Sequence, residues 1–313
     1  MPDSRASSDP PPSPALPQWE PLGGRRLLVR APAKLNLSLR VMGRRPDGFH
    51  ELDSLVAKIT LYDELILAPL PDGRLELTCD SPDVGPIEKN LAFRAARLLA
   101  EHLGSAAPGR EARGVSIKLH KRIAVGAGLG GGSSDAAAAL VGLNRLWGAH
   151  LGNAQLSALG GRLGSDVPLF LAGPASRMRG RGEVLVPVAL PAFWAVLICP
   201  PAHCSTGKIY SAYDQMPPLC SGPLDVALLE GRPVDQWPAL LKNDLFRAAC
   251  AVCPQIQDWA GRVAQTVGRK VLMTGSGSGL FVLLSDFSAT LITAKALKNQ
   301  HIDRCEVVSI NPW

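Results

Sequence analysis

Gly126-Ala127-Gly128-Leu129-Gly130-Gly131-Gly132-Ser133-Ser134 is the stretch of sequence that decides the fold. An Ala-rich segment that ends near Trp147 follows it and predicts a helix, so the glycines lie at a helix start. Backbone N–H groups without side chains beside them can approach an anion closely, and the helix dipole adds about half a positive charge. The stretch therefore predicts a phosphate-binding loop. A flexible loop that only caps the helix is the alternative.

Gly126, Gly128 and Gly131 also satisfy the G-x-G-x-x-G pattern of dinucleotide-binding loops. That pattern requires a buried parallel strand before the loop and an acidic residue about 20 residues after it. Residues 115–119 instead alternate apolar and polar side chains, as in a half-exposed strand, and the region around Leu151 has no carboxylate. A dinucleotide site is not indicated.

The loop also differs from two common ATP-binding loops. A Walker A loop ends in Gly-Lys-Ser/Thr, whereas Gly132 is followed by Ser133. The glycine loop of protein kinases leads into a strand, whereas a helix is predicted here. The sequence therefore predicts a phosphate loop of another kind.

Segments before and after the loop predict a mixture of strands and helices. Residues 34–42 alternate apolar and polar side chains, which predicts a strand with one wet face in an antiparallel sheet. Residues 65–67 and 75–78, separated by Pro71-Asp72-Gly73, predict a hairpin. Asn90 predicts the N-cap of a helix.

A second set of segments begins beyond about Pro187. Strands are predicted over 193–199, 271–273, 280–284 and 307–310, and helices over 243–252, over 256–267 and from about 287. The length of 313 residues fits two domains. The predicted fold class is α+β, with two α+β domains of mainly antiparallel sheets over residues 25–187 and 188–313.

Composition excludes several classes of protein. Hydrophobic residues make up 46% of the chain and charged residues 19%, which excludes disorder of the whole chain. Apolar stretches stay well below the roughly 18 residues that span a bilayer, so an integral membrane protein is not expected. The net charge of +6 suits an anionic partner, either a nucleic acid or a nucleotide phosphate. Residues 1–24 are rich in Pro and Ser and predict a disordered tail.

The 7 cysteines are an odd number, and no secretion signal precedes them, so a disulfide framework is not expected. A reducing cytoplasm is the predicted location. Cys250 and Cys253 have C-x-x-C spacing, but no second pair follows to complete a zinc site. We expect both to be core side chains.

Residues 126–136 resemble the central motif of the GHMP small-molecule kinases, P-x-x-x-G-L-G-S/G-S-S-A/D, with Ala124 where proline is frequent. Three blocks resemble the members of that family that act on a cytidyl diphosphate sugar alcohol: Ala31-Pro32-Ala33-Lys34-Leu35-Asn36-Leu37, Asp47-Gly48-Phe49-His50-Glu51-Leu52 and Gly164-Ser165-Asp166-Val167-Pro168-Leu169-Phe170. The resemblance covers about residues 28–310.

This resemblance implies a GHMP kinase fold and a phosphotransferase with an alcohol acceptor. ATP and Mg²⁺ are the implied cofactors, and the 2-hydroxyl of the cytidyl diphosphate sugar alcohol is the implied target, in the non-mevalonate route to isoprenoid precursors. We further expect a cytoplasmic monomer or weak homodimer that binds neither nucleic acid nor membrane.

Asp166 and Lys34 are the predicted catalytic residues. Phosphoryl transfer to an alcohol needs a group that takes the hydroxyl proton, and Asp166 precedes an apolar segment where a carboxylate lacks a packing role. The alternative for Asp166 is the N-cap of a helix over 167–171. Lys34 is either on a solvated face or held for a partner; the resemblance implies a place beside the catalytic aspartate.

The resemblance also implies the binding residues. ATP is assigned to Ala124, Val125, Gly126, Ala127, Gly128, Leu129, Gly130, Gly131, Gly132, Ser133 and Ser134. The acceptor is assigned to Asn36, Phe49, His50 and Tyr210, with Phe49 where the family more often has Tyr. No side chain is assigned to a metal ion.

Several other residues have open interpretations. Asp135 would repel a bound phosphate, so it either points away or faces a Mg²⁺ ion between them. Asn90 and Asn144 are candidates for an adenine pocket, and residues 274–279 for a turn beside the phosphates. A basic cluster is predicted to be a solvated face; it consists of Arg177, Arg179 and Arg181.

Two other functions compete with this hypothesis. One is a kinase of the same superfamily for another small alcohol, such as homoserine, which would have no purpose for Phe49, His50 and Tyr210. The other is RNA binding, which predicts clustered basic residues with interleaved aromatics. Aromatic residues are only 5% of the chain and the basic residues are dispersed, so the sequence does not favour it.

Overall fold

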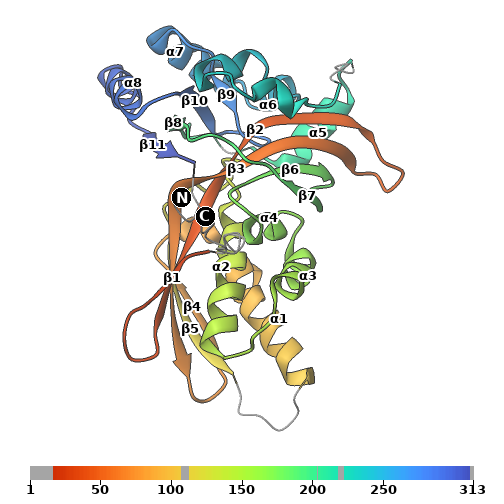
Figure 1. The fold of residues 1–313 in the computed structure, drawn as a ribbon, viewed down its shortest axis with the longest axis vertical. Coiled ribbons are helices and arrows are strands. Elements are labelled where there is room, and N and C mark those ends of the chain that lie inside the picture. Colours follow the sequence, from red (N-terminus) through yellow and green to blue (C-terminus); the bar gives the residue numbers. More distant parts are fainter. Residues whose placement is uncertain (1–16, 107–112, 203, 218–221, 311–313) are drawn as a thin grey trace, which may run out of the picture.

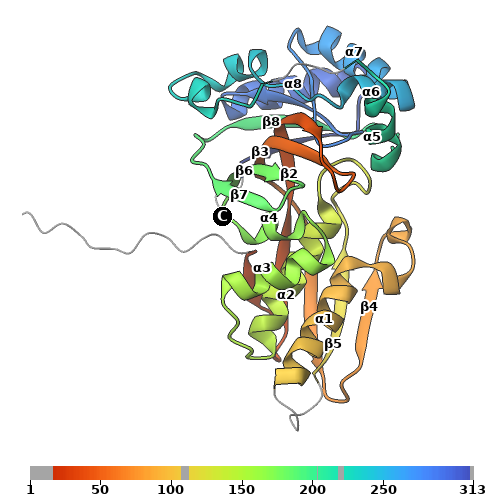
Figure 2. The ribbon, with the colours of Figure 1, turned by 90° about the vertical axis from the view of Figure 1, so that its right-hand side faces the viewer.

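The computed structural model describes residues 17–106, 113–202, 204–217 and 222–310, which form two sheets with helices packed on them (Figures 1 and 2). The strands are β1 (Trp19–Pro21), β2 (Leu27–Arg44), β3 (His50–Leu70), β4 (Leu75–Cys79), β5 (Gly114–His120), β6 (Ala175–Gly180), β7 (Val184–Pro187), β8 (Trp194–Ile198), β9 (Leu272–Met273), β10 (Leu280–Leu284) and β11 (Cys305–Ser309). The α-helices are α1 (Leu91–Ala106), α2 (Gly131–Leu146), α3 (Asn153–Leu163), α4 (Val167–Leu171), α5 (Thr206–Asp214), α6 (Phe246–Val252), α7 (Gln255–Val267) and α8 (Phe287–Asn299).

The long antiparallel pair of strands β2 and β3 connects the two layers of the molecule. The pair runs from Leu27 opposite Leu67 to Arg44 opposite His50, and Figure 1 shows it passing from the lower layer to the upper one. At its lower end the pair packs against α1 and α2, and at its upper end against the smaller sheet. It is therefore buried on both faces along much of its length, which departs from the predicted single wet face.

The larger sheet has 7 strands in the order β1-β2-β3-β5-β4, with β6 paired to β3 and β7 paired to β6. The predicted hairpin of residues 65–67 with 75–78 is wrong, because β5 lies between β3 and β4. The reason is burial: the apolar residues Val115, Ile117 and Leu119 of β5 are fully covered, whereas β4 is only partly buried and suits the edge.

The smaller sheet has 4 strands in the order β11-β8-β10-β9 and lies across the upper end of the long pair (Figure 2). Alternate residues of its strands face opposite sides. Leu197 and Phe281 pack toward the long strands, and Val196 and Val282 pack among residues of α5 to α8. All strand pairs of the described residues are antiparallel except β4 with β5, so the predicted α+β class with mainly antiparallel sheets is confirmed.

Part of the predicted disordered tail is ordered. Trp19–Pro21 form β1 and pair with residues 27–29 of β2. The centroid of the Trp19 ring lies 4.9 Å from the guanidinium carbon of Arg145, and Glu20 pairs with Arg30. These two contacts fix β1 in place. The prediction of disorder is wrong for this segment; residues 1–16 lie outside the described residues. None of the described helices is long and apolar enough to span a bilayer.

Gly142 sets how closely α2 packs on the larger sheet. A Cβ at this position would overlap a methyl group of Leu67 and lie 2.7 Å from Cγ2 of Val29, both buried side chains of the sheet. By contrast, a Cβ on Gly161 in the exposed face of α3 would meet nothing within 4 Å.

We expect Gly142→Ala to lower the free energy of unfolding by about 1–3 kcal/mol, because overpacking exceeds the gain in helix propensity. The matched Gly161→Ala should raise it by about 0.5–1 kcal/mol. Urea unfolding followed by circular dichroism measures both. A stabilised Gly142→Ala variant would contradict this account of the packing.

Candidate active site

The glycine loop needs glycine for its conformation and for its contacts. Gly126, Gly128 and Gly130 have φ angles of 74°, 74° and 72°, in the left-handed region. A Cβ on Gly130 would lie 2.8 Å from the ring of Phe170 and 3.2 Å from Cγ of Lys34. Helix α2 then begins at Gly131, so its first N–H groups have no partner within the helix and remain for an anion.

Two segments far apart in the sequence, β2 and residues 274–279, hold this loop and bond each other. The backbone N–H of Lys34 in β2 donates to the carbonyl of Leu129 at 3.0 Å, and the N–H of Gly279 donates to the carbonyl of Ala127 at 3.0 Å. The Thr274 hydroxyl accepts the backbone N–H of Asn36 at 2.9 Å. The predicted turn over 274–279 is thus packed directly on the loop.

Cavities open on both sides of the loop. The larger, of about 660 Å³, lies between β2, the tip of the β2–β3 hairpin, α4 and α5, and the smaller, of about 340 Å³, lies beside α1 and the start of α2. Gly128, Gly130 and Ser133 line both cavities, so the loop forms their common wall.

The structure distributes the predicted residues between these cavities. The larger cavity is lined by the predicted catalytic and acceptor residues Lys34, Asn36, Phe49, His50, Asp166 and Tyr210. The smaller is lined by the predicted ATP residues Ala124, Val125, Gly126, Gly128, Leu129, Gly130, Gly131, Gly132 and Ser133. Ala127 and Ser134 line neither cavity; both are buried.

Lys34 is buried, with 5% of its surface exposed, and its ammonium group donates to the side-chain oxygen of Asn36. Asn36 in turn donates to the Ser54 hydroxyl at 2.8 Å. Burial lowers the pKa of Lys34 to about 8, although the negative charge of Asp166 acts in the opposite direction. The alternative of a solvated lysine is therefore wrong, because the smaller sheet and the loop cover this face of β2.

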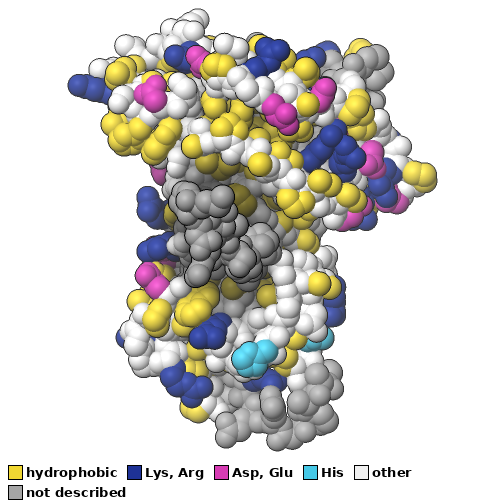
Figure 3. All heavy atoms as spheres, viewed as in Figure 1, with side chains coloured by type: hydrophobic (Ala, Val, Ile, Leu, Met, Phe, Trp, Pro, Cys, Tyr) yellow, Lys and Arg dark blue, Asp and Glu magenta, His cyan; other side chains and the backbone are white. Residues whose placement is uncertain are grey.

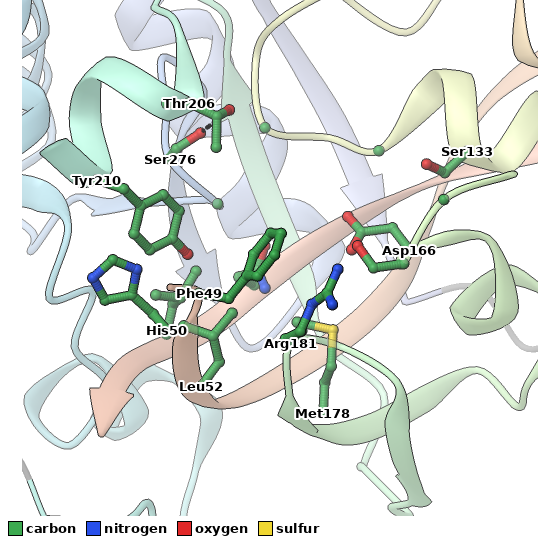
Figure 4. Close-up of a pocket in the computed structure, with 18 of the residues that line it drawn as sticks. Phe49, His50, Leu52, Ser133, Asp166, Met178, Arg181, Thr206, Tyr210 and Ser276 are labelled. Carbon is green, nitrogen blue, oxygen red and sulfur yellow. Dashed lines mark hydrogen bonds between the residues drawn. The ribbon is translucent and has the colours of Figure 1, made fainter. Parts of the chain in front are cut away.

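Asp166 occupies the N-cap position of α4, but its side chain makes no capping hydrogen bond. Figure 4 shows the carboxylate directed into the larger cavity, across from Phe49 and near Ser133. The alternative in which Asp166 serves as a helix cap is thus not supported, and its carboxylate faces the space in which a hydroxyl group could lie.

Aromatic side chains gather at the other end of the larger cavity (Figure 4). The rings of His50 and Tyr210 stack with centroids 4.8 Å apart, and Phe49 is 52% exposed at the cavity mouth. Nε2 of His50 lies 2.6 Å from Oδ1 of Asp214. Sequence reasoning missed Asp214, although its spacing of one helical turn from Tyr210 on α5 was an available signal.

Asp135 lines the smaller cavity and pairs there with a buried cation, Lys121. Its Oδ2 accepts a hydrogen bond from Nζ of Lys121 at 2.7 Å, and Lys121 also pairs with Asp63. Asp63 further accepts the backbone N–H groups of Arg122 and Ile123 at 2.6 and 2.8 Å. This network fastens the first turn of α2 to β3, and Lys121 supplies the positive charge that faces Asp135.

Asn90 and Asn144 have different roles. Asn90 caps α1 by accepting the N–H of Ala92 at 2.9 Å, as predicted, and it also lines the smaller cavity. Asn144 does not line that cavity, because its side chain bonds both backbone groups of Leu151. It therefore holds the turn after α2, and the structure does not support its place in an adenine pocket at the smaller cavity.

The basic cluster is only partly a solvated face. Arg177 makes a two-pronged pair with the buried Asp53 at 2.7 and 2.6 Å, so the prediction of a solvated side chain is wrong for it. Arg179 is exposed on the same hairpin, whereas Arg181 lines the larger cavity. The pairing partner was not visible in the sequence, because Asp53 is 124 positions away.

The search for metal-binding side chains found no cluster of three or more His, Cys, Asp or Glu within the part of the chain that the structure describes. Cys250 and Cys253 are half-buried and pack against the core of the smaller sheet. This agrees with the expectation of core side chains.

Known proteins resemble this chain in sequence and in fold. Residues 90–174 match the N-terminal domain of the GHMP kinases. A 4-diphosphocytidyl-2-C-methyl-D-erythritol kinase of Hahella chejuensis is 38% identical over 269 residues, which are 83% of this chain and 86% of the relative. The chain belongs to this kinase family.

Solved structures agree with the assignment. A crystal structure of 4-(cytidine 5'-diphospho)-2C-methyl-D-erythritol kinase matches with a TM-score of 0.72 and 37% identity, covering 90% of this chain and 98% of that one. A homoserine kinase from Cytophaga hutchinsonii matches with a TM-score of 0.65 at 20% identity, which shows the shared fold alone. The predicted GHMP kinase fold is confirmed, and the protein is a small-molecule kinase.

Proposed function

We propose that this kinase transfers the γ-phosphoryl group of ATP to the 2-hydroxyl of 4-diphosphocytidyl-2-C-methyl-D-erythritol. The proposal rests on one observation: the glycine loop forms a common wall between the two cavities. The smaller cavity presents backbone N–H groups at a helix start, and the larger presents a carboxylate at one end and stacked aromatic rings at the other. A nucleotide and a cytidine-bearing alcohol fit these chemistries.

Asp166 is the proposed base for the acceptor hydroxyl. In phosphoryl transfer most of the catalysis is positioning and charge stabilisation, and one group takes the hydroxyl proton. Lys34, buried in the same cavity and in the field of Asp166, would offset negative charge on the transferring group. The N–H groups at the start of α2 would hold the nucleotide phosphates.

The acceptor's pyrimidine is assigned to the aromatic end of the larger cavity. Phe49 and Tyr210 offer ring faces, and His50, oriented by Asp214, offers a ring nitrogen to the base. Asn36 lies beside Lys34 and would contact polar groups of the acceptor. The rival kinases for small alcohols have no need of these rings.

Mg²⁺ is proposed to enter with the nucleotide. Mg²⁺ usually keeps several waters and binds through substrate phosphates with few protein ligands, which fits a site whose described residues contain no carboxylate cluster. Ser133 lines both cavities, so its hydroxyl is the protein group best placed to hold the ion. When bound, the ion would offset the charge of the phosphates.

The RNA-binding alternative gains no support from the surface. Figure 3 shows Lys and Arg side chains scattered over both layers on the face drawn, among acidic and apolar ones. The binding of polynucleotides favours a continuous basic face.

We further infer that the chain divides into two domains near Pro187 and acts in the cytoplasm as a monomer or weak homodimer.

The proposal is tested by ATP consumption across a panel of acceptors. We expect turnover with 4-diphosphocytidyl-2-C-methyl-D-erythritol and none with 2-C-methyl-D-erythritol 4-phosphate, homoserine or mevalonate, because only the first fills the aromatic end. A coupled ADP assay measures each rate. Equal turnover of homoserine would exclude the proposed specificity.

Asp166→Asn should lower kcat by about 10²–10⁴-fold, because the proton acceptor is lost while size and packing are kept. ATP affinity should stay within about twofold, because Asp166 lines the larger cavity and not the smaller one, to which ATP is assigned. Steady-state kinetics and ATP titration measure the two quantities. Undiminished turnover in this variant would remove Asp166 from the mechanism.

Lys34 should impose an alkaline limit on the reaction. Its pKa is lowered to about 8, so its positive charge is present below that pH and is lost as pH rises through it. We therefore expect kcat/KM for the acceptor to fall above about pH 8. Lys34→Arg, whose charge persists, should move this limit to higher pH, and an unchanged profile would contradict the assignment.

A further inference from the structure

Arg181 lies in the turn between β6 and β7 and reaches into the larger cavity. Its guanidinium carbon lies 3.7 Å from the centroid of the Phe49 ring. Figure 4 shows the guanidinium group between Phe49 on one side and Asp166 on the other. The side chain thus occupies the middle of the cavity, between the aromatic end and the reacting end.

The turn that carries Arg181 is held in place from both sides. The backbone N–H of Arg181 donates to the carboxylate of Glu183 at 2.5 Å, and that of Gly180 donates to Glu51 at 3.0 Å. A Cβ on Gly182 would lie 3.6 Å from Oδ1 of Asp166, which shows how closely the turn approaches the proposed base. The position of Arg181 in the cavity is therefore set by the backbone and not by its side chain alone.

The other cations of this cavity have side-chain partners. Lys34 donates to the side-chain oxygen of Asn36 and lies in the field of Asp166. At the aromatic end, Arg44 lies 3.9 Å from Asp214, which also bonds His50.

Arg181 differs from these cations. Within the described residues no carboxylate lies within ion-pair distance of its guanidinium group. Its positive charge acts on Asp47 only over a longer distance. Stacking on Phe49 uses the face of the guanidinium and leaves its N–H edges for an anion. The cavity therefore has one exposed positive group at its middle that is available to a ligand.

We propose that Arg181 binds the diphosphate of the acceptor and selects for acceptors that carry one. The inference rests on the proposed function, in which the pyrimidine lies at the aromatic end and the hydroxyl lies at Asp166. In such an acceptor the diphosphate stands between these two parts, which is where the guanidinium lies. A planar guanidinium matches the geometry of phosphate oxygens and can bond two of them at once.

Competition at saturating ATP separates this role from simple support of Phe49. The inhibitors are CDP and cytidine, tested against the acceptor with the wild-type protein and with Arg181→Gln. We expect the inhibition constant of CDP to rise about tenfold, a modest effect because the site is exposed. That of cytidine should stay within twofold.

Matched variants make the result specific. Arg179→Gln removes the same charge two residues away on the same hairpin, outside the cavity, and should leave both constants unchanged. Arg181→Lys keeps the charge without the fork and should lose only part of the CDP affinity. The affinity of the wild type for CDP should also fall more steeply with salt than that of Arg181→Gln.

The outcomes separate this proposal from the proposed function. If Arg181→Gln weakens cytidine as much as CDP, or weakens neither, Arg181 does not bind the diphosphate, and the kinase activity stands. If the wild-type protein turns over no cytidyl diphosphate acceptor, the proposed function is wrong and this inference is wrong with it. Thermal unfolding of each variant excludes a loss of fold as the cause.

Discussion

The backbone contact between the glycine loop and residues 274–279 is the constraint on which the site depends. A side chain at Gly128 would overlap the carbonyl of Thr274, and a Cβ on Gly275 would lie 3.0 Å from the carbonyl of Gly128. Because the loop also bonds β2 at Lys34, this contact brings the smaller sheet, the larger sheet and α2 to one place. Glycine is needed here for packing as much as for the approach of a phosphate.

The polar face of β2 shows how that place is kept rigid. Lys34, Asn36 and Ser38 are buried, which costs free energy unless each polar group finds a partner. The partners are present: the Ser54 hydroxyl donates to the carbonyl of Ser38 at 2.6 Å, and the Ser38 hydroxyl donates to the carbonyl of Lys242 at 2.9 Å. A satisfied buried network of this kind fixes the side chains that form the cavity floor.

The sequence correctly predicted those features that depend only on residues close together in the chain. The loop, the helix after it and the Asn90 cap depend on neighbouring residues, and all three appear as expected. The wet face of β2 and the hairpin of β3 with β4 were predicted wrongly, because each depends on which distant segment covers or pairs with the strand. Asp214 and Arg181 were missed as cavity residues for the same reason, since α5 and the β6–β7 turn reach the cavity only in the folded chain.

Two carboxylates lie close to the glycine loop, and a lysine between them keeps the loop compatible with the binding of an anion. Asp63 and Asp135 lie close to the start of α2, and two full negative charges there would oppose a phosphate. Lys121 between them supplies a buried positive charge, and burial raises the pKa of Asp135, which weakens its ionisation near neutral pH. The network therefore fastens the loop without placing two full negative charges beside it, and Lys121 adds a positive charge to the lining of the smaller cavity beside the N–H groups of α2.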